Sequence, residues 1–403
     1  MQIQVHASID GIPATGWNNL AGTQPFLRHE FLAALEHSGC VGAATGWQPQ
    51  HLTCTDESGK LIGALPLYLK SHSWGEYVFD WAWAEAYQRA GKHYYPKLAA
   101  AVPFSPVTGP RLLALVGTER HAIREALVAR TVALAAERHA SSVHCLFPEA
   151  PETGDWQDHG FLLRKDCQFH WHNRGYRNFD EFLASLSAEK RKKIKRERRR
   201  VQETGITFQT CRGGDLDTKL LQTLYRFYAI TYAKHGHASY LNLDFFKEIA
   251  RTMPDSLLVN FAKLDDEPVA CAVCFRNRDT LYGRHWGCAQ EYHSLHFEAC
   301  YYQGIDYCIR EGLEHFNPGT QGEHKLARGF EPTATWSMHY IAEPTFHAAI
   351  ADYLQRETHT MDNYIQAATR HLPFGNRDAG RRSRKTATPV LVIPESPPHD
   401  SSR

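Results

Sequence analysis

The same order of predicted elements occurs twice along this chain, and that repetition constrains the fold more than any single motif does. The segments "DESGKLIGALPLYL" (56–69) and "LDDEPVACAVCFR" (264–276) both place an acidic turn before small residues that alternate with apolar ones. They belong to predicted hairpins at 52–69 and 257–275, and each hairpin follows a helix and precedes a helix–strand pair. Similarity at domain scale indicates duplication rather than a solenoid. We expect the two hairpins to occupy equivalent positions in two similar halves.

The mixed order of strands and helices favours an α/β (α+β) fold, with helices on the faces of mixed central sheets. A chain of 403 residues is too long for one ordinary core. We therefore predict an N-terminal domain over 1–172, a C-terminal domain over 173–374 and a disordered tail over 375–403, which is rich in Pro, Ser and Arg. The other predicted elements are helices at 24–38, 119–140, 215–236 and 296–316 and strands at 142–147 and 333–341.

Composition narrows the cellular setting. The mean hydropathy is −0.46 and no run of 18 apolar residues occurs, so a membrane span is not expected. The first residues, "MQIQVHASIDGIPATGW", lack the basic and apolar regions of a signal peptide. The ten cysteines show no framework spacing. These features predict a cytoplasmic protein with reduced thiols.

A metal site is not predicted. The one CxxC, Cys271 to Cys274, lies in a predicted strand, where residues three apart face opposite sides. The segment "EYHSLHFEACYY" holds His293, His296 and Glu298, but without the spacing of HExxH or a similar ligand motif. A metal hydrolase that uses these three residues is kept as a third alternative, and it predicts bound zinc.

The charge is distributed unevenly. The segment "KRKKIKRERRR" (190–200) has nine basic residues and one acid, a net charge of +8, so the rest of the chain sums to −7. We expect one helix over 179–205, with Ser187 as a possible N-cap inside it and no capping box, and a basic stretch near 187–203. The stretch is either a solvated face or a phosphate-binding face for a pyrophosphate cofactor or an RNA backbone. The candidate phosphate-binding residues are Lys192, Lys193, Lys195 and Arg196.

Polar functional groups gather in three segments of the second half, near a predicted strand end, a helix start and a glycine-rich turn. Strand ends and helix N-termini are common places for small-molecule sites. Lysine and arginine suit carboxylate or phosphate binding, and histidine suits proton transfer near neutral pH. The candidate substrate-binding residues are Arg284, His285, Trp286, Tyr301, Tyr302, Lys325 and Arg328, and the candidate catalytic residues are Glu298 and His324.

We expect Glu298 or His324 to handle a proton, although a carboxylate near a helix start also occurs simply because it complements the helix dipole. His285, Lys325 and Arg328 would polarise or bind the substrate. The glycines at 319, 322 and 329 would let the substrate approach the backbone. The convergence of Arg284, His285, Glu298, His324, Lys325 and Arg328 on one cleft is the strongest expectation about the site.

Several longer segments resemble those of a bacterial family of predicted N-acyltransferases. They are "PFLRHEFLAALEHSG", "YYPKLAAAVPFSPVTGPRLL", "YLNLDFF", "LYGRHWGC", "LHFEACYYQGIDYCI" and "GEHKLARGFEPTATWSMHY". That family is similar to the Fem peptidoglycan aminoacyltransferases and belongs to the GNAT superfamily, and the resemblance covers roughly residues 10–370.

The resemblance implies two tandem GNAT-like domains that transfer an acyl or aminoacyl group to a small-molecule or peptide amine, with a peptidoglycan precursor as one candidate acceptor. No permanently bound cofactor and no metal are implied; the co-substrate would be acyl-CoA or aminoacyl-tRNA. The usual acyl-CoA loop, Gln/Arg-x-x-Gly-x-Gly/Ala, is missing at a strand-to-helix junction here, which leaves room for a tRNA partner. The alternative is a non-catalytic protein on the same fold that binds nucleic acid or peptidoglycan precursors.

Overall fold

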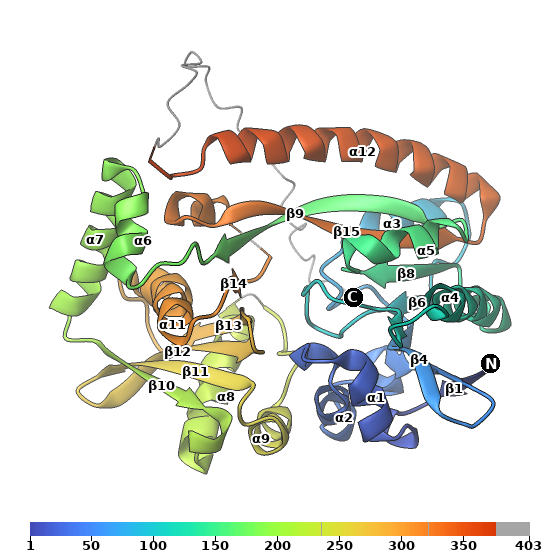
Figure 1. Cartoon of the computed structure of the whole chain (residues 1–403), viewed down its shortest axis with the longest axis horizontal. Coiled ribbons are helices and arrows are strands. Elements are labelled where there is room, and N and C mark those ends of the chain that lie inside the picture. The colour runs from blue at the N-terminus through green and yellow to red at the C-terminus, as the bar shows by residue number, and fades with distance from the viewer. Residues whose placement is uncertain (235, 321, 376–403) are drawn as a thin grey trace.

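The computed structural model describes residues 1–234, 236–320 and 322–375. The predicted disordered tail therefore lies outside the described residues from position 376 onward. Two halves lie side by side, the first towards the right and the second towards the left of Figure 1. Among the described residues, none of the helices combines the length and the apolar character that crossing a bilayer requires.

The strands of the first half are divided between a separate four-stranded sheet and one end of an 11-stranded sheet. The second predicted strand of its hairpin is interrupted at Pro66, because proline lacks the N–H group that a continuous ladder needs. The strands are β1 (Gln2–His6), β2 (Trp47–Pro49), β3 (His51–Thr55), β4 (Leu61–Leu65), β5 (Leu67–Lys70), β6 (Lys97–Ala100), β7 (Leu113–Ala114) and β8 (Ser142–Leu146).

The second half repeats this arrangement. Its strands are β10 (Thr207–Arg212), β11 (Leu257–Leu264), β12 (Glu267–Arg276), β13 (Thr280–Cys288) and β14 (His315–Asn317). Antiparallel pairs join β10 to β11, β11 to β12 and β12 to β13, and a parallel pair joins β13 to β14. In the first half β1, β3, β4/β5, β6 and β8 pair in the same sequence of directions. The predicted equivalence of the two hairpins is thus confirmed in topology.

The two halves exchange strands at their junction. β9 (Leu162–His172) pairs with β14 of the second half, and β15 (Glu331–Ile341) pairs with β8 of the first half. β9 and β15 also pair with each other in antiparallel fashion. One sheet of 11 strands therefore runs through both halves, in the order β10-β11-β12-β13-β14-β9-β15-β8-β6-β5-β2. The domain boundary at 172/173 stays a prediction. β15 lies in the range predicted for the C-terminal domain, but it forms part of the first half's side of the sheet.

Helices cover both faces of the sheet, and the long α12 runs over β9 and β15 (Figure 1). The helix predicted over 179–205 is wrong in one respect, because the structure divides it at Leu186 and Ser187. Ser187 occupies the N-cap position of the second piece without a side-chain cap bond. The helices are α1 (Ala14–Ala21), α2 (His29–His37), α3 (Trp81–Arg89), α4 (Arg120–Glu137), α5 (Thr153–Gln157), α6 (Phe179–Ser185), α7 (Ala188–Glu203), α8 (Thr218–Lys234), α9 (Leu243–Thr252), α10 (Leu295–Phe297), α11 (Gln303–Glu311) and α12 (Pro344–Arg370).

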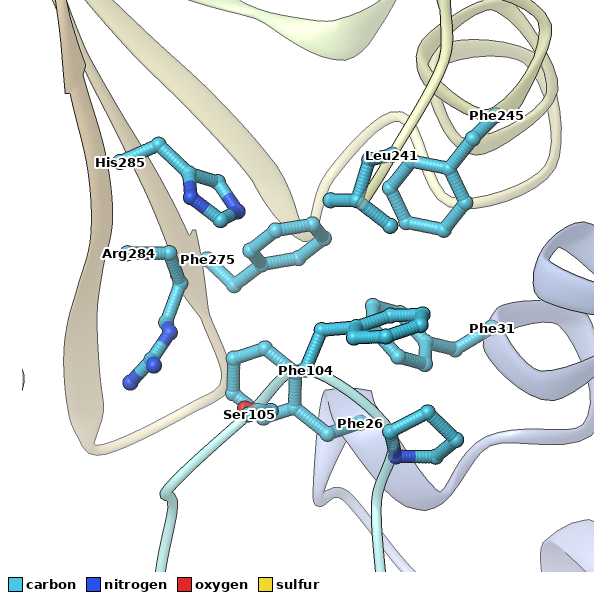
Figure 2. Close-up of a pocket in the computed structure, with 10 residues that line it drawn as sticks. Phe26, Phe31, Phe104, Ser105, Leu241, Phe245, Phe275, Arg284 and His285 are labelled. Carbon is cyan, nitrogen blue, oxygen red and sulfur yellow. The ribbon is translucent and has the colours of Figure 1, made fainter. Parts of the chain in front are cut away.

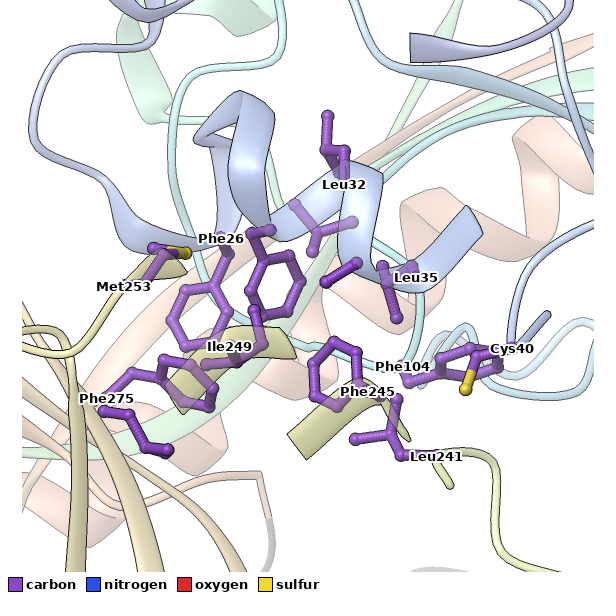
Figure 3. Close-up of a cluster of buried hydrophobic side chains, with 14 of the residues drawn as sticks. Phe26, Leu32, Leu35, Cys40, Phe104, Leu241, Phe245, Ile249, Met253 and Phe275 are labelled. Atoms are coloured by element: carbon purple, nitrogen blue, oxygen red, sulfur yellow. The ribbon is translucent and has the colours of Figure 1, made fainter. Parts of the chain in front are cut away.

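A shared apolar core joins the halves. Phe26 is 1% exposed, and its ring centroid lies 5.1 Å from that of Phe275 on β12 and 5.3 Å from that of Tyr282 on β13. Phe31 on α2 likewise contacts Phe245 on α9, with ring centroids 5.6 Å apart. Figure 3 shows side chains of α2, α9 and β12 meeting in this cluster. A large apolar interface of this kind fixes the relative position of the halves.

Candidate functional site

The site begins where two parallel strands of the second half separate. β13 and β14 are paired over only three residues each, Thr280–Tyr282 against His315–Asn317, and β13 then continues to Cys288 without β14. The segment after β14 crosses this separation closely, since a Cβ added to Gly283 would lie 3.3 Å from the Cα of Pro318. A side chain at this position would force the neighbouring backbone to shift by a few tenths of an ångström, so glycine suits this close approach.

A β-bulge lies on β13 at the separation. His285 is opposite Val273 and Gly283 is opposite Cys274, so Arg284 is the extra residue without a partner on β12. Consecutive strand residues normally face opposite sides, but a bulge redirects a side chain. Arg284 and His285 consequently both line the same cavity, as Figure 2 shows.

The cavity lies between the two halves and its wall is largely aromatic. It has room for about one water molecule. The guanidinium carbon of Arg284 lies 5.8 Å from the ring centroid of Phe26, and its Nη1 is buried without a hydrogen-bond partner. Burial, with Arg284 as the second cause, lowers the pKa of His285 to about 3, so its imidazole is neutral. Phe26, Phe31, Phe104 and Ser105 come from the first half, and Leu241, Phe245 and Phe275 from the second.

Lys325 lies on the short 3-10 helix η7 (Glu323–Arg328), which follows the separated strands. Its side chain is buried, and its Nζ donates a hydrogen bond to the carbonyl oxygen of Gly319 at 2.7 Å. Burial lowers the pKa of Lys325 to about 7, and the charge of Arg284 contributes to this lowering. The site therefore holds one permanent cation and a second cation that titrates near neutral pH.

This shift predicts a pH-dependent stability. In the folded protein Lys325 has a pKa of about 7, below the ordinary 10.5, so the unfolded chain binds more protons between these values. Stability should accordingly rise with pH through this window. Between pH 7 and pH 10, in a buffer poor in anions, wild type should gain at least about 1 kcal/mol of stability relative to Lys325→Met. Urea unfolding measures this, with the exposed Lys219→Met as control; a difference that does not change with pH would refute it.

Arg328 is part of a buried network that ties η7 to α7. Its Nη2 donates to both carboxylate oxygens of Glu197 at 3.0 Å, and its Nε donates to the Tyr302 hydroxyl at 2.9 Å. The Tyr302 hydroxyl in turn donates to Glu197. The guanidinium also stacks over the ring of Phe297 at 3.6 Å. These contacts fix the position of η7 against α7.

Glu298 begins a π-helical turn, Glu298–Tyr302, between α10 and α11. Both of its carboxylate oxygens accept from Nε of Arg198 on α7 at 3.2 Å, and one accepts from Gln303 at 2.8 Å. Burial raises the pKa of Glu298, while Arg198 opposes that rise. The carboxylate is therefore held as a clamp between α7 and the π-turn.

His324 is the exposed member of the cluster. Its Nε2 lies 2.9 Å from the hydroxyl of Tyr301, and the ring keeps an edge open to solvent. Partial burial and the cations Arg328 and Lys325 lower the pKa of His324 to about 4. A neutral imidazole at pH 7 can accept a proton, and Tyr301 fixes its orientation.

The six residues expected to line one cleft fall into two groups. Arg284 and His285 line the cavity, and Lys325 is close enough to Arg284 to feel its charge, whereas Glu298 and Arg328 are engaged with α7. The single-cleft expectation is corrected accordingly, because α7 supplies the buried Glu197 and the half-buried Arg198 as partners. His324 lies between the groups, next to Lys325 in sequence. Trp286 lies at the same edge and contacts His296, with ring centroids 5.5 Å apart.

The basic helix α7 has two different faces. Ile194, Glu197 and Val201 are buried, whereas Lys192, Lys193, Lys195 and Arg196 are exposed. In the described ranges none of these four cations has an ion-pair partner within 4.0 Å. They remain candidates for phosphate binding, on a face that adjoins η7.

Sequence reasoning missed a polar network in the first half. Lys97 on β6 is fully buried and pairs with Asp80 and with Glu76, whose oxygen is 2.8 Å away. His144 on β8 and His339 on β15 meet through their Nδ1 atoms at 2.7 Å. The alternation of residues around 339 predicts the strand. The polar face of that strand is buried only because β15 is exchanged between the halves, and the local sequence does not indicate this exchange.

The sequence comparison places the chain among Fem-like proteins. A family model described as FemAB-like, peptidoglycan biosynthesis/recognition, matches residues 8–376. Among curated protein sequences none matches significantly.

Several solved structures share the fold. FemX is 12% identical, with 87% of this chain and 100% of FemX covered and a TM-score of 0.53. The C-terminal DUF2156 domain of a protein described as a lysylphosphatidylglycerol synthetase from Agrobacterium fabrum is 12% identical, with 84% and 95% covered and a TM-score of 0.51. A tandem GNAT protein of clavulanic acid biosynthesis is 11% identical, with 85% and 99% covered and a TM-score of 0.46. The prediction of two tandem GNAT-like domains with mixed sheets is confirmed by the repeated strand pairing and the likeness to FemX.

Proposed function

Because this chain belongs to the FemAB-like family of peptidoglycan biosynthesis and recognition, we propose that it is an N-acyltransferase. It transfers an acyl or aminoacyl group to the amine of a small-molecule or peptide acceptor, and it acts in the cytoplasm, where both donor classes are made. The observation that carries the proposal is the separation of β13 from β14, near which a half-buried arginine, a buried lysine and a neutral histidine lie.

In the proposed reaction the amine attacks the donor carbonyl directly, and the tetrahedral intermediate then breaks the bond to the leaving group, which departs as the thiol of CoA or the ribose hydroxyl of the tRNA after it takes up a proton. His324 takes the proton that the attacking amine loses, since its imidazole is neutral at pH 7 and one nitrogen is already held by Tyr301. A cation near the reacting carbonyl stabilises the oxyanion that forms. Lys325 suits this role because its side chain is buried and is cationic below pH 7, and because it directly follows His324 in the sequence. Glu298 keeps the π-turn and α7 in register instead of acting as the base.

The donor is acyl-CoA or aminoacyl-tRNA, and the exposed face of α7 favours the tRNA. Its four unpaired cations suit a long polyanion better than a compact cofactor with few phosphates. Native mass spectrometry of the protein purified from its host tests the proposal through its ligands. A bound CoA ester or a bound aminoacylated RNA supports the transferase. A protein that carries RNA without an aminoacyl group, and forms no amide when aminoacyl-tRNA or acyl-CoA is added, would instead be a nucleic-acid-binding protein.

The α7 face yields a quantitative prediction. The variant Lys192→Ser, Lys193→Ser, Lys195→Ser, Arg196→Ser should bind tRNA more weakly than wild type, with a shallower dependence on salt. In a plot of log affinity against log salt concentration, the slope changes by roughly 0.7 for each single-strand phosphate that the variant no longer neutralises. Fluorescence anisotropy at several salt concentrations measures the slope.

The matched control removes four dispersed exposed cations, through Lys60→Ser, Arg138→Ser, Lys219→Ser and Arg251→Ser, and so has the same net charge as the test variant. Its salt slope should stay close to that of wild type. Equal slopes for the α7 variant and wild type would mean that this face is only solvated.

A further inference from the structure

The basic run at 190–200 contains one acidic residue, Glu197, and the fold turns it inward. Ile194, Glu197 and Val201 follow one another at spacings of three and four, and they form the buried face of α7. The side chain of Glu197 is only 8% exposed. A buried carboxylate costs free energy unless it is paired, so the partners of Glu197 indicate its role.

These partners lie on the two segments that carry the candidate catalytic residues. Both carboxylate oxygens of Glu197 accept from Nη2 of Arg328 on η7 at 3.0 Å, and one of them also accepts from the hydroxyl of Tyr302 on the π-turn. Nε of Arg328 donates to the same hydroxyl at 2.9 Å. All three side chains are buried. Glu197, Arg328 and Tyr302 therefore form a closed triangle of hydrogen bonds that joins α7, η7 and the π-turn.

Arg328 extends this triangle to the proposed base. Its Nη1 donates to the carbonyl oxygen of His324, four residues earlier on η7, at 2.8 Å. The ring of His324 is held separately, since its Nε2 lies 2.9 Å from the hydroxyl of Tyr301 on the π-turn. The backbone of His324 is thus tied to α7 through Arg328 and Glu197, while its ring is tied to the π-turn.

We infer that Glu197 is a positioning residue for the proposed transfer. Through Arg328 it sets where His324 lies relative to α7, the helix whose exposed cations are the candidate phosphate-binding residues. The inference rests on the proposed function and adds to it a residue that contacts the base only through another side chain. A misplacement of about 1 Å can lower a rate about 10²-fold, so the position of His324 should control turnover. Donor binding should change little, because Glu197 faces away from the exposed cations.

Hydrogen–deuterium exchange tests the link without any turnover. In Glu197→Gln the guanidinium of Arg328 loses its charged partner, so the amides of η7 should exchange at least about tenfold faster than in wild type. Peptides from α4 in the first half should exchange at the wild-type rate, which separates local loosening from global destabilisation. The matched control is Glu203→Gln, which removes the same charge from an exposed position of the same helix and should leave η7 unchanged.

Steady-state kinetics of amide formation test the role in the reaction. Glu197→Gln should lower kcat at least about tenfold and change KM for the donor by less than about threefold, whereas Glu203→Gln should change neither. If Glu197 acts through Arg328, adding Glu197→Gln to Arg328→Met should lower kcat no further. Tyr302→Phe removes one hydroxyl from the triangle, so it should shift exchange and kcat in the same direction by a smaller factor. Circular dichroism shows whether each variant is folded, and Tyr302→Phe keeps the test valid if Glu197→Gln is unstable.

Three outcomes would overturn the inference. Unchanged exchange of η7 in both Glu197→Gln and Tyr302→Phe would show that the triangle does not hold this segment. A loosened η7 with an unchanged kcat would show that the triangle stabilises the fold without positioning the base. A further loss of kcat when Glu197→Gln is added to Arg328→Met would show that Glu197 acts by another route. If wild type forms no amide with either donor while Glu197→Gln still loosens η7, the link between the segments is retained and the transferase is rejected.

Discussion

Replacing Phe26 with alanine is expected to destabilise the whole protein by about 3–5 kcal/mol, the usual loss for a fully buried phenylalanine. Phe26 belongs to the first half, yet it packs on Phe275 and Tyr282 of the second. Because the interface is part of one core, both halves should lose stability together. The outer surface provides a matched control, Phe79→Ala, since Phe79 is 56% exposed and should change stability little.

Urea unfolding followed by tryptophan fluorescence and by far-UV circular dichroism measures the effect. Coincident transitions that shift together in Phe26→Ala would show that the halves unfold as one unit. A loss below about 1 kcal/mol, or two separate transitions of which only one moves, would show that the halves are independent domains in contact.

Replacing His324 with alanine is expected to lower kcat by about 10²-fold or more, the usual size of a general-base effect. In the wild type kcat/KM should rise with pH through about 4 as the imidazole loses its proton, since the base form is the active one. His324→Ala should lack this limb. The exposed His359→Ala on α12 is the control and should retain both the rate and the profile.

Glu298→Gln separates catalysis from positioning. Because the carboxylate is paired with Arg198, the substitution should weaken the contact between α7 and the π-turn, and it should lower stability more than His324→Ala does. If instead Glu298→Gln abolished turnover in a protein of unchanged stability, and His324→Ala left turnover intact, the roles given to these residues would have to be exchanged.

Local sequence patterns predicted most of the helices and strands, but not the exchange of strands between the two halves. The two hairpins, the helix at α4 and the strand at β15 follow from periodicity and turn residues, which are properties of neighbouring positions. The pairing of β9 with β14 and of β15 with β8 depends on contacts between distant parts of the chain. For the same reason sequence reasoning treated His339 as one member of an alternating strand and missed its partner His144.

The sequence indicated which segments contribute to the site, but not how their side chains are arranged in space. The residue types at 284–286, 298–302 and 324–328 indicated binding and proton transfer. The bulge that turns Arg284 and His285 to one side is invisible in the sequence, and so is the capture of Arg328 by Glu197. Ser105 lay in a segment that resembled the family, but nothing local indicated that it lines the same cavity as Arg284.

The central claim is that the separated strands of the second half form the site of an N-acyltransferase. Its most direct test is a transfer assay with isotopically labelled aminoacyl-tRNA and acyl-CoA, offered with a panel of peptides that carry a free amine. Mass spectrometry identifies the product. The expected result is an amide between the labelled acyl group and the peptide amine, formed by wild type and by His359→Ala but at least about 10²-fold more slowly by His324→Ala. Absence of amide with both donors, or an equal rate in His324→Ala, would contradict the account.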